Sequence, residues 1–181
     1  ITAHADVHFD GIAAEDVVAE ANLLFYGNPD LAIPPGEYQT PWRWISVLPN
    51  THLFAITGHT HAFGTNVEIA TSTGVDDPGT TIYPGAEPFT WSEPPVEQFD
   101  PAMVFDGSQG FRYRCSWDNT SGGELDFGES ATKEMCFLWA YYYPSQGYRL
   151  CVSPGSIGNG VAGDEVCCPG HWVCDYIQQF L

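Results

Sequence analysis

Apolar and aromatic residues gather in short runs along this chain, and polar turn-forming residues separate the runs. The two clearest runs are FRYRCSWDN (111–119) and MCFLWAYYYP (135–144). Earlier runs of the same kind are ANLLFYG (21–27), PWRWISVL (41–48), HLFAITGHTHAFG (52–64) and NVEIATST (66–73). Short runs rich in aromatic and β-branched residues, bounded by Gly, Pro, Asn and Asp, are typical of strands. We therefore predict an all-β fold.

The remaining segments frame these strands. Residues 1–20 indicate a short strand followed by a helical turn, with a bend at Asp10-Gly11. Residues 74–101 carry many Pro, Gly and acidic residues, which favours a loop with one short strand at 89–91. We predict three parts: an N-terminal extension (1–20), a β-domain (21–152) and a Cys-rich tail (153–181) packed on that domain.

The charge balance excludes some classes of partner. The chain has 5 Lys+Arg against 23 Asp+Glu, a formal net charge of −18. Such a surface repels nucleic-acid phosphates and anionic lipids. It suits an extracellular or saline setting or attracts cations, but an acidic surface kept for solubility is the more common explanation. No apolar run approaches the roughly 18 residues of a membrane span. Asn119-Thr120-Ser121 is a glycosylation sequon, relevant only in a eukaryotic source.

Six cysteines favour three disulfides in an exported protein, so we predict a secreted or periplasmic location. Four of them are Cys151, Cys167, Cys168 and Cys174. A bond between the adjacent Cys167 and Cys168 would be strained, which leaves two crosswise pairings open. A zinc site formed by these cysteines with His171 is the alternative.

Two histidines and a methionine are candidate metal ligands. His59 and His61 are two residues apart, so on a strand their imidazoles share one face, as a copper or zinc site requires. Ordinary surface or core histidines are the alternative. Met135 heads the odd-numbered face of the run at 135–144. A methionine there fills a core or offers a thioether ligand.

Four stretches together resemble one family. They are IPPGE (33–37), HLFAITGHTHAFG (52–64), RCSWDN (114–119) and EMCFLWAYYYP (134–144). The chain resembles the copper type II, ascorbate-dependent monooxygenases, which include peptidylglycine α-hydroxylating and dopamine β-monooxygenases. The similarity lies in their second, C-terminal domain, which carries the oxygen-activating copper.

The resemblance implies an antiparallel β-sandwich of jelly-roll type and one copper ion, held by His59, His61 and Met135. It also implies a disulfide between Cys115 and Cys136 beside the site. His52 matches a histidine that supports the ligands, and an ordinary core histidine is the alternative. Because His52 precedes His59 by seven residues, a bulge or bend is needed to bring both to one face.

Departures from the family pattern bear on the substrate. Peptide-hydroxylating members hold the substrate carboxylate with polar residues where this chain has Thr57, Phe137 and Trp139. A peptide carboxylate would find no partner there, and the two aromatic residues suggest a small apolar or aromatic substrate. Family enzymes also carry a preceding domain with a second copper bound by three histidines. Outside the proposed ligand set this chain has only four histidines: His4, His8, His52 and His171. The sequence as given begins at Ile1, so its first residue is not a histidine that could bind copper.

Three functions follow as alternatives. The first is a copper monooxygenase, or its oxygen-binding half, that hydroxylates C–H bonds with O2 and a reductant such as ascorbate. It would need a second copper domain upstream or in another chain. The second is a copper carrier or reservoir without turnover. The third is a structural subunit that self-associates and retains the fold.

Overall fold

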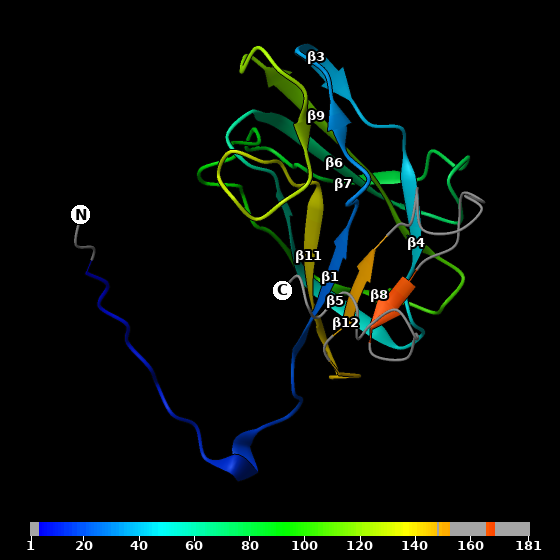
Figure 1. Ribbon diagram of the computed structural model, residues 1–181. Helices are drawn as coiled ribbons and strands as arrows, with labels where there is room; N and C mark the ends of the chain where they lie inside the picture. Colours follow the sequence, from blue (N-terminus) through cyan, green and yellow to red (C-terminus); the bar gives the residue numbers. More distant parts are fainter. Residues whose placement is uncertain (1–3, 148, 153–165, 169–181) are drawn as a thin grey trace.

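Two β-sheets face each other in the computed structural model, which describes residues 4–147, 149–152 and 166–168 (Figure 1). The six-stranded sheet runs β13 (Val166–Cys168), β12 (Arg149–Val152), β1 (Asn22–Gly27), β11 (Phe137–Tyr143), β5 (Thr51–His59) and β8 (Glu97–Phe105). The five-stranded sheet runs β3 (Gly36–Gln39), β9 (Gly110–Asn119), β6 (Gly64–Ser72) and β7 (Thr80–Tyr83), and β4 (Arg43–Ser46) also pairs with β9. A separate pair joins β10 (Leu125–Asp126) to β2 (Ala32–Ile33).

The predicted all-β class is confirmed, with one correction to the antiparallel pairing. Strands β1 and β12 run parallel, whereas the other strand pairs among the described residues are antiparallel. After β11 the chain crosses β1 and pairs with its other edge. Strands β12 and β1 both run opposite to β11, and so they are parallel to each other. The jelly-roll connectivity stays a prediction. Most of the predicted Cys-rich tail, 153–165 and 169–181, lies outside the described residues.

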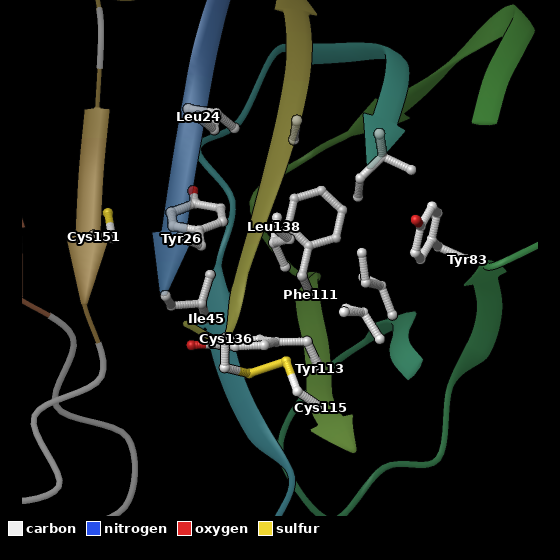
Figure 2. Packing of buried hydrophobic residues seen from close by; sticks show 14 of the residues in the cluster. Leu24, Tyr26, Ile45, Tyr83, Phe111, Tyr113, Cys115, Cys136, Leu138 and Cys151 are labelled. Carbon is white, nitrogen blue, oxygen red and sulfur yellow. A yellow bond between two sulfur atoms is a disulfide. The ribbon is translucent and has the colours of Figure 1, made fainter. Parts of the chain in front are cut away.

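The core lies between the sheets because alternate residues of each strand face inward. Leu24, Tyr26 and Leu138 of the six-stranded sheet are almost fully buried, as are Phe111 and Tyr113 of the five-stranded sheet (Figure 2). The rings of Tyr26 and Phe111 lie 6.0 Å apart across the interface. Each such side chain contributes about 1.5–3 kcal/mol through its burial. This core fixes the two sheets relative to each other, and the candidate ligands lie at or beyond the ends of two of its strands.

Two strands occupy the segment predicted as a loop. Residues 74–101 contain β7 and the start of β8, and no strand forms at 89–91. Strand β8 carries Glu97, Asp100 and Pro101, which disfavour an interior strand. Because β8 lies at the edge of its sheet, charged residues and proline are tolerated there.

The N-terminal extension leaves the sheets as an exposed arm (Figure 1). Residues 4–20 contain the predicted helical turn, η1 (Ala14–Asp16), but no strand. The predicted short strand is therefore wrong for residues 4–20, where Phe9 is 89% exposed and buries no apolar face. No helix in the described part of the chain is long and apolar enough to cross a membrane.

Candidate metal centre

The candidate ligands meet at one end of the six-stranded sheet. Strands β5 and β11 are antiparallel, and His59 pairs with Phe137. Residues just after His59 and just before Phe137 therefore lie at the same sheet end. His61 lies in the turn after β5, and Met135 lies in the segment before β11. The expectation that both histidines lie on one strand is thus wrong for His61, because β5 ends at His59.

The turn nevertheless brings the two imidazoles together. The ring centroids of His59 and His61 are 5.3 Å apart, with the planes at 85°. Nδ1 of His61 lies 2.9 Å from the carbonyl oxygen of Lys133. Because a carbonyl oxygen only accepts hydrogen bonds, Nδ1 carries the proton, and in the neutral imidazole Nε2 then keeps the lone pair. A histidine that ligates a metal typically donates its other N–H in this way.

His59 is held neutral and in a fixed orientation. Two effects lower the pKa of His59 from 6.5 to about 4: burial, which is the larger, and electrostatic repulsion by His61. Its imidazole is therefore uncharged at neutral pH and offers a lone pair. The His59 ring stacks on Trp139 at 5.3 Å with 16° between the planes. Trp139 in turn stacks on Phe25 at 5.6 Å.

Met135 lies between two anchored neighbours. It is half-buried, whereas Glu134 and Cys136 on either side are fully buried. Cys136 forms a disulfide with Cys115 of β9, the pair that the family resemblance implied (Figure 2). This bond ties the segment that carries Met135 to the opposite sheet.

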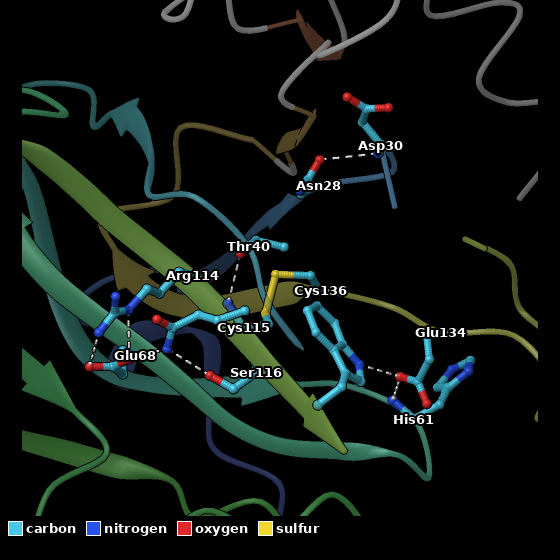
Figure 3. Close-up of a disulfide and its surroundings, with 12 residues drawn as sticks. Asn28, Asp30, Thr40, His61, Glu68, Arg114, Cys115, Ser116, Glu134 and Cys136 are labelled. Carbon is cyan, nitrogen blue, oxygen red and sulfur yellow. Dashed lines mark hydrogen bonds and ion pairs between the residues drawn. A yellow bond between two sulfur atoms is a disulfide. The ribbon is translucent and has the colours of Figure 1, made fainter. Parts of the chain in front are cut away.

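Glu134 is a site residue that we did not single out from the sequence. Its buried carboxylate accepts hydrogen bonds from the backbone N–H of His61 (Figure 3), from the backbone N–H of Phe63 and from the indole N–H of Trp117. The sequence does hold a signal, because Glu134 is the last charged residue before the apolar run at 135–144. The groups that donate hydrogen bonds to Glu134 belong to segments distant in sequence, and so the sequence does not predict which residues they are.

His52 is not brought to this cluster. The register of β5 shifts between Leu53 and Ala55, which is the bulge that the resemblance required, and His52 then faces the same side as His59. However, His52 lies near the other end of β5, about 20 Å along the strand from His59. Its ring contacts Tyr143 at 5.0 Å.

The three positions that depart from the family pattern differ in accessibility. The Thr57 hydroxyl is buried and donates to the carbonyl oxygen of Pro95, 2.8 Å away. Phe137 is only 4% exposed, because its ring fills the space beside Gly27 and contacts Phe25. Trp139 is half-buried. The apolar surface expected next to the site is therefore supplied by Trp139 and not by Phe137.

The donor set suits copper. Among the described residues, no three His, Cys, Asp or Glu side chains form a group that could hold a metal ion. Two imidazoles and a thioether are a different set. Imidazole accepts either copper valence, and the soft thioether favours Cu(I). His4 and His8 lie on the exposed arm. The alternative zinc site at Cys151, Cys167, Cys168, Cys174 and His171 falls largely outside the described residues.

Comparison with models of protein families gives a match. A family model described as copper type II ascorbate-dependent monooxygenase, C-terminal domain, matches residues 21–160, which is more than half of the chain. No curated protein matches the chain.

Proposed function

Because this chain belongs to the copper type II ascorbate-dependent monooxygenase family, as a C-terminal domain, we propose that it is the oxygen-activating half of a copper monooxygenase. In this proposal His59, His61 and Met135 hold one copper ion. When bound, copper would supply one-electron redox chemistry and a position at which O2 reacts. The reaction class is hydroxylation of a C–H bond with O2 and a reductant such as ascorbate.

The hydrogen bond from His61 Nδ1 to the Lys133 carbonyl carries this proposal. It fixes the tautomer and leaves the Nε2 lone pair of His61 for a metal ion. The ring centroid of His61 lies 5.3 Å from that of the second imidazole, His59. The residues that follow Lys133 deliver a thioether to the same sheet end.

Trp139 supports a small apolar or aromatic substrate. It is half-buried and stacks on His59, so it lines the approach to the site. A substrate carboxylate has no fixed partner at the three departing positions, since Thr57 already donates to Pro95 and Phe137 is buried. We infer that peptides ending in glycine are poor substrates.

The proposed reaction needs a source for a second electron. Hydroxylation by O2 requires two electrons from the enzyme, and one copper site holds one. The second would come from ascorbate, from a second copper domain upstream, or from another chain.

The Cys115–Cys136 disulfide supports an exported protein, because such bonds persist in oxidising compartments.

Oxygen uptake should distinguish this function from copper storage. We expect the copper-loaded domain, moved from anaerobic to aerobic buffer with ascorbate, to consume O2 slowly and release peroxide. It should not hydroxylate a glycine-extended peptide at a measurable rate, because the groups that orient the carboxylate are missing. The measurements are an oxygen electrode, a peroxide assay and mass spectrometry of the peptide.

Unbound copper also reduces O2, so the control is His61→Ala, loaded and desalted in parallel. It should consume almost no O2. Reversible Cu(I) binding without oxygen uptake would instead identify a carrier. Coupled hydroxylation of the peptide would refute the reasoning about the substrate.

A further inference from the structure

We propose that Glu134 is a positioning residue that holds the His61 turn against the segment bearing Met135, an inference that rests on the copper site proposed above. The Glu134 side chain is completely buried, unlike most glutamates of this acidic chain. It lies directly before Met135 and faces the turn that follows β5 (Figure 3). Glu134 thus connects the two parts of the chain that supply the ligands.

Both carboxylate oxygens of Glu134 are used. Oε2 accepts hydrogen bonds from the backbone N–H of His61 and from Nε1–H of Trp117, both at 2.9 Å. Oε1 accepts one from the backbone N–H of Phe63, also at 2.9 Å. Two bonds therefore set the path of the His61 turn, and the third ties the carboxylate to β9 of the opposite sheet.

The backbone of Glu134 is anchored as well. Its N–H donates to the carbonyl of Asp126 at 3.0 Å, and its own carbonyl accepts from Gly128 at 3.2 Å. Glu134 is therefore immobilised from both sides, and Met135 is attached to it by one peptide bond. The His61–Lys133 hydrogen bond adds a parallel link on the other side of Glu134. Together these bonds determine where the imidazole lies relative to the thioether segment.

Filling space does not explain a carboxylate at this position. An apolar side chain would occupy a buried volume without the cost of removing a carboxylate from water. What it would lack is acceptor oxygens that fix the direction of two backbone N–H groups. Orientation of the His61 turn is the property that this residue type adds.

The test uses Glu134→Gln, which removes one acceptor oxygen, and Glu134→Asp, which keeps the charge but shortens the reach. Glu129→Gln is the control, because Glu129 is exposed in the same loop. In metal-free protein, we expect NMR signals of the His61 and Phe63 amides and of the Trp117 indole to shift and to exchange faster with solvent in both Glu134 variants. Glu129→Gln should resemble the wild type.

The copper readout separates positioning from general stability. We expect Cu(I) affinity to fall about 10- to 100-fold in both Glu134 variants, the range seen when supporting groups of metal ligands are lost. X-ray absorption of the Cu(I) form should show a weaker sulfur contribution. If Glu134→Asp binds Cu(I) like the wild type, the length of the side chain does not matter for copper binding. That result would overturn the proposal.

The two proposals fail differently. Wild-type protein that binds no copper would refute the proposed function, while the metal-free spectra would still decide whether Glu134 holds the turn. Unchanged His61 and Phe63 signals in folded variants would overturn the positioning role even if copper binds. Should both Glu134 variants fail to fold, Trp117→Phe removes one donor and should shift the Glu134-bonded amides of His61 and Phe63; their constancy would overturn it too.

Discussion

His59→Ala and His61→Ala should each reduce Cu(II) affinity by more than about 100-fold. Loss of a group that merely supports a metal ligand costs 10- to 100-fold, and removal of the ligand itself should cost more. Each imidazole is already prepared for binding, since His59 is neutral at pH 7 and His61 has its Nδ1 proton bound by a carbonyl. Isothermal titration calorimetry and EPR of the Cu(II) form would measure the loss.

Met135→Ala should behave differently from the histidine variants. A thioether is a soft ligand, so its removal should weaken Cu(I) binding while most of the Cu(II) affinity remains. His52→Ala is the matched control, because His52 is on the same strand as His59 but near its other end. It should bind copper like the wild type. An unchanged Cu(II) spectrum in His59→Ala would refute the ligand assignment.

Removal of the Cys115–Cys136 disulfide should lower the free energy of unfolding by about 3 kcal/mol. The bond joins residues 21 apart in sequence. In the loop-entropy account, a cross-link over a loop of this size restricts the unfolded chain by that amount. Urea unfolding of a Cys115→Ala/Cys136→Ala variant without reductant would measure the loss. Copper affinity should fall as well, because Met135 adjoins Cys136.

Repeating the unfolding experiment with reductant is the control for lost volume. Both cysteine side chains are fully buried, so alanine also removes packed sulfur atoms. Under reduction the cross-link is absent from both proteins, and the difference should shrink to the packing contribution. Equal urea midpoints for the oxidised proteins would show that the bond does not stabilise the domain.

Much of the fold was predictable because its central strands are dense in apolar residues. The run at 135–144 became β11, with Phe137, Trp139, Tyr141 and Tyr143 on one face, as its odd-even pattern predicted. Strand β8 escaped prediction because an edge strand needs no continuous apolar pattern. Its Glu97, Asp100 and Pro101 follow the rules for an edge, which resemble those for a loop.

The candidate site was predictable by residue type but not by arrangement. His59 and His61 are identifiable by their spacing of two, and all three ligands, with Met135, by the family resemblance of the stretches that contain them. The turn at His61 depends on Glu134, whose partners are about 17 and 70 residues away in sequence. Hydrogen bonds over such separations leave no local pattern. The same holds for the position of His52, which depends on a bulge in β5.

The stacking of Trp139 gives this domain an internal optical reporter. Its indole ring stacks on the His59 imidazole and also on the Phe25 ring. These two contacts hold the indole next to a candidate ligand. An indole in contact with such an imidazole loses emission when a paramagnetic ion or a positive charge arrives at that ring. Of the six tryptophans, Trp139 is the one whose ring stacks on a candidate ligand in the described structure. Its intrinsic fluorescence would therefore follow occupancy of the site in unlabelled protein, in real time and at micromolar concentration.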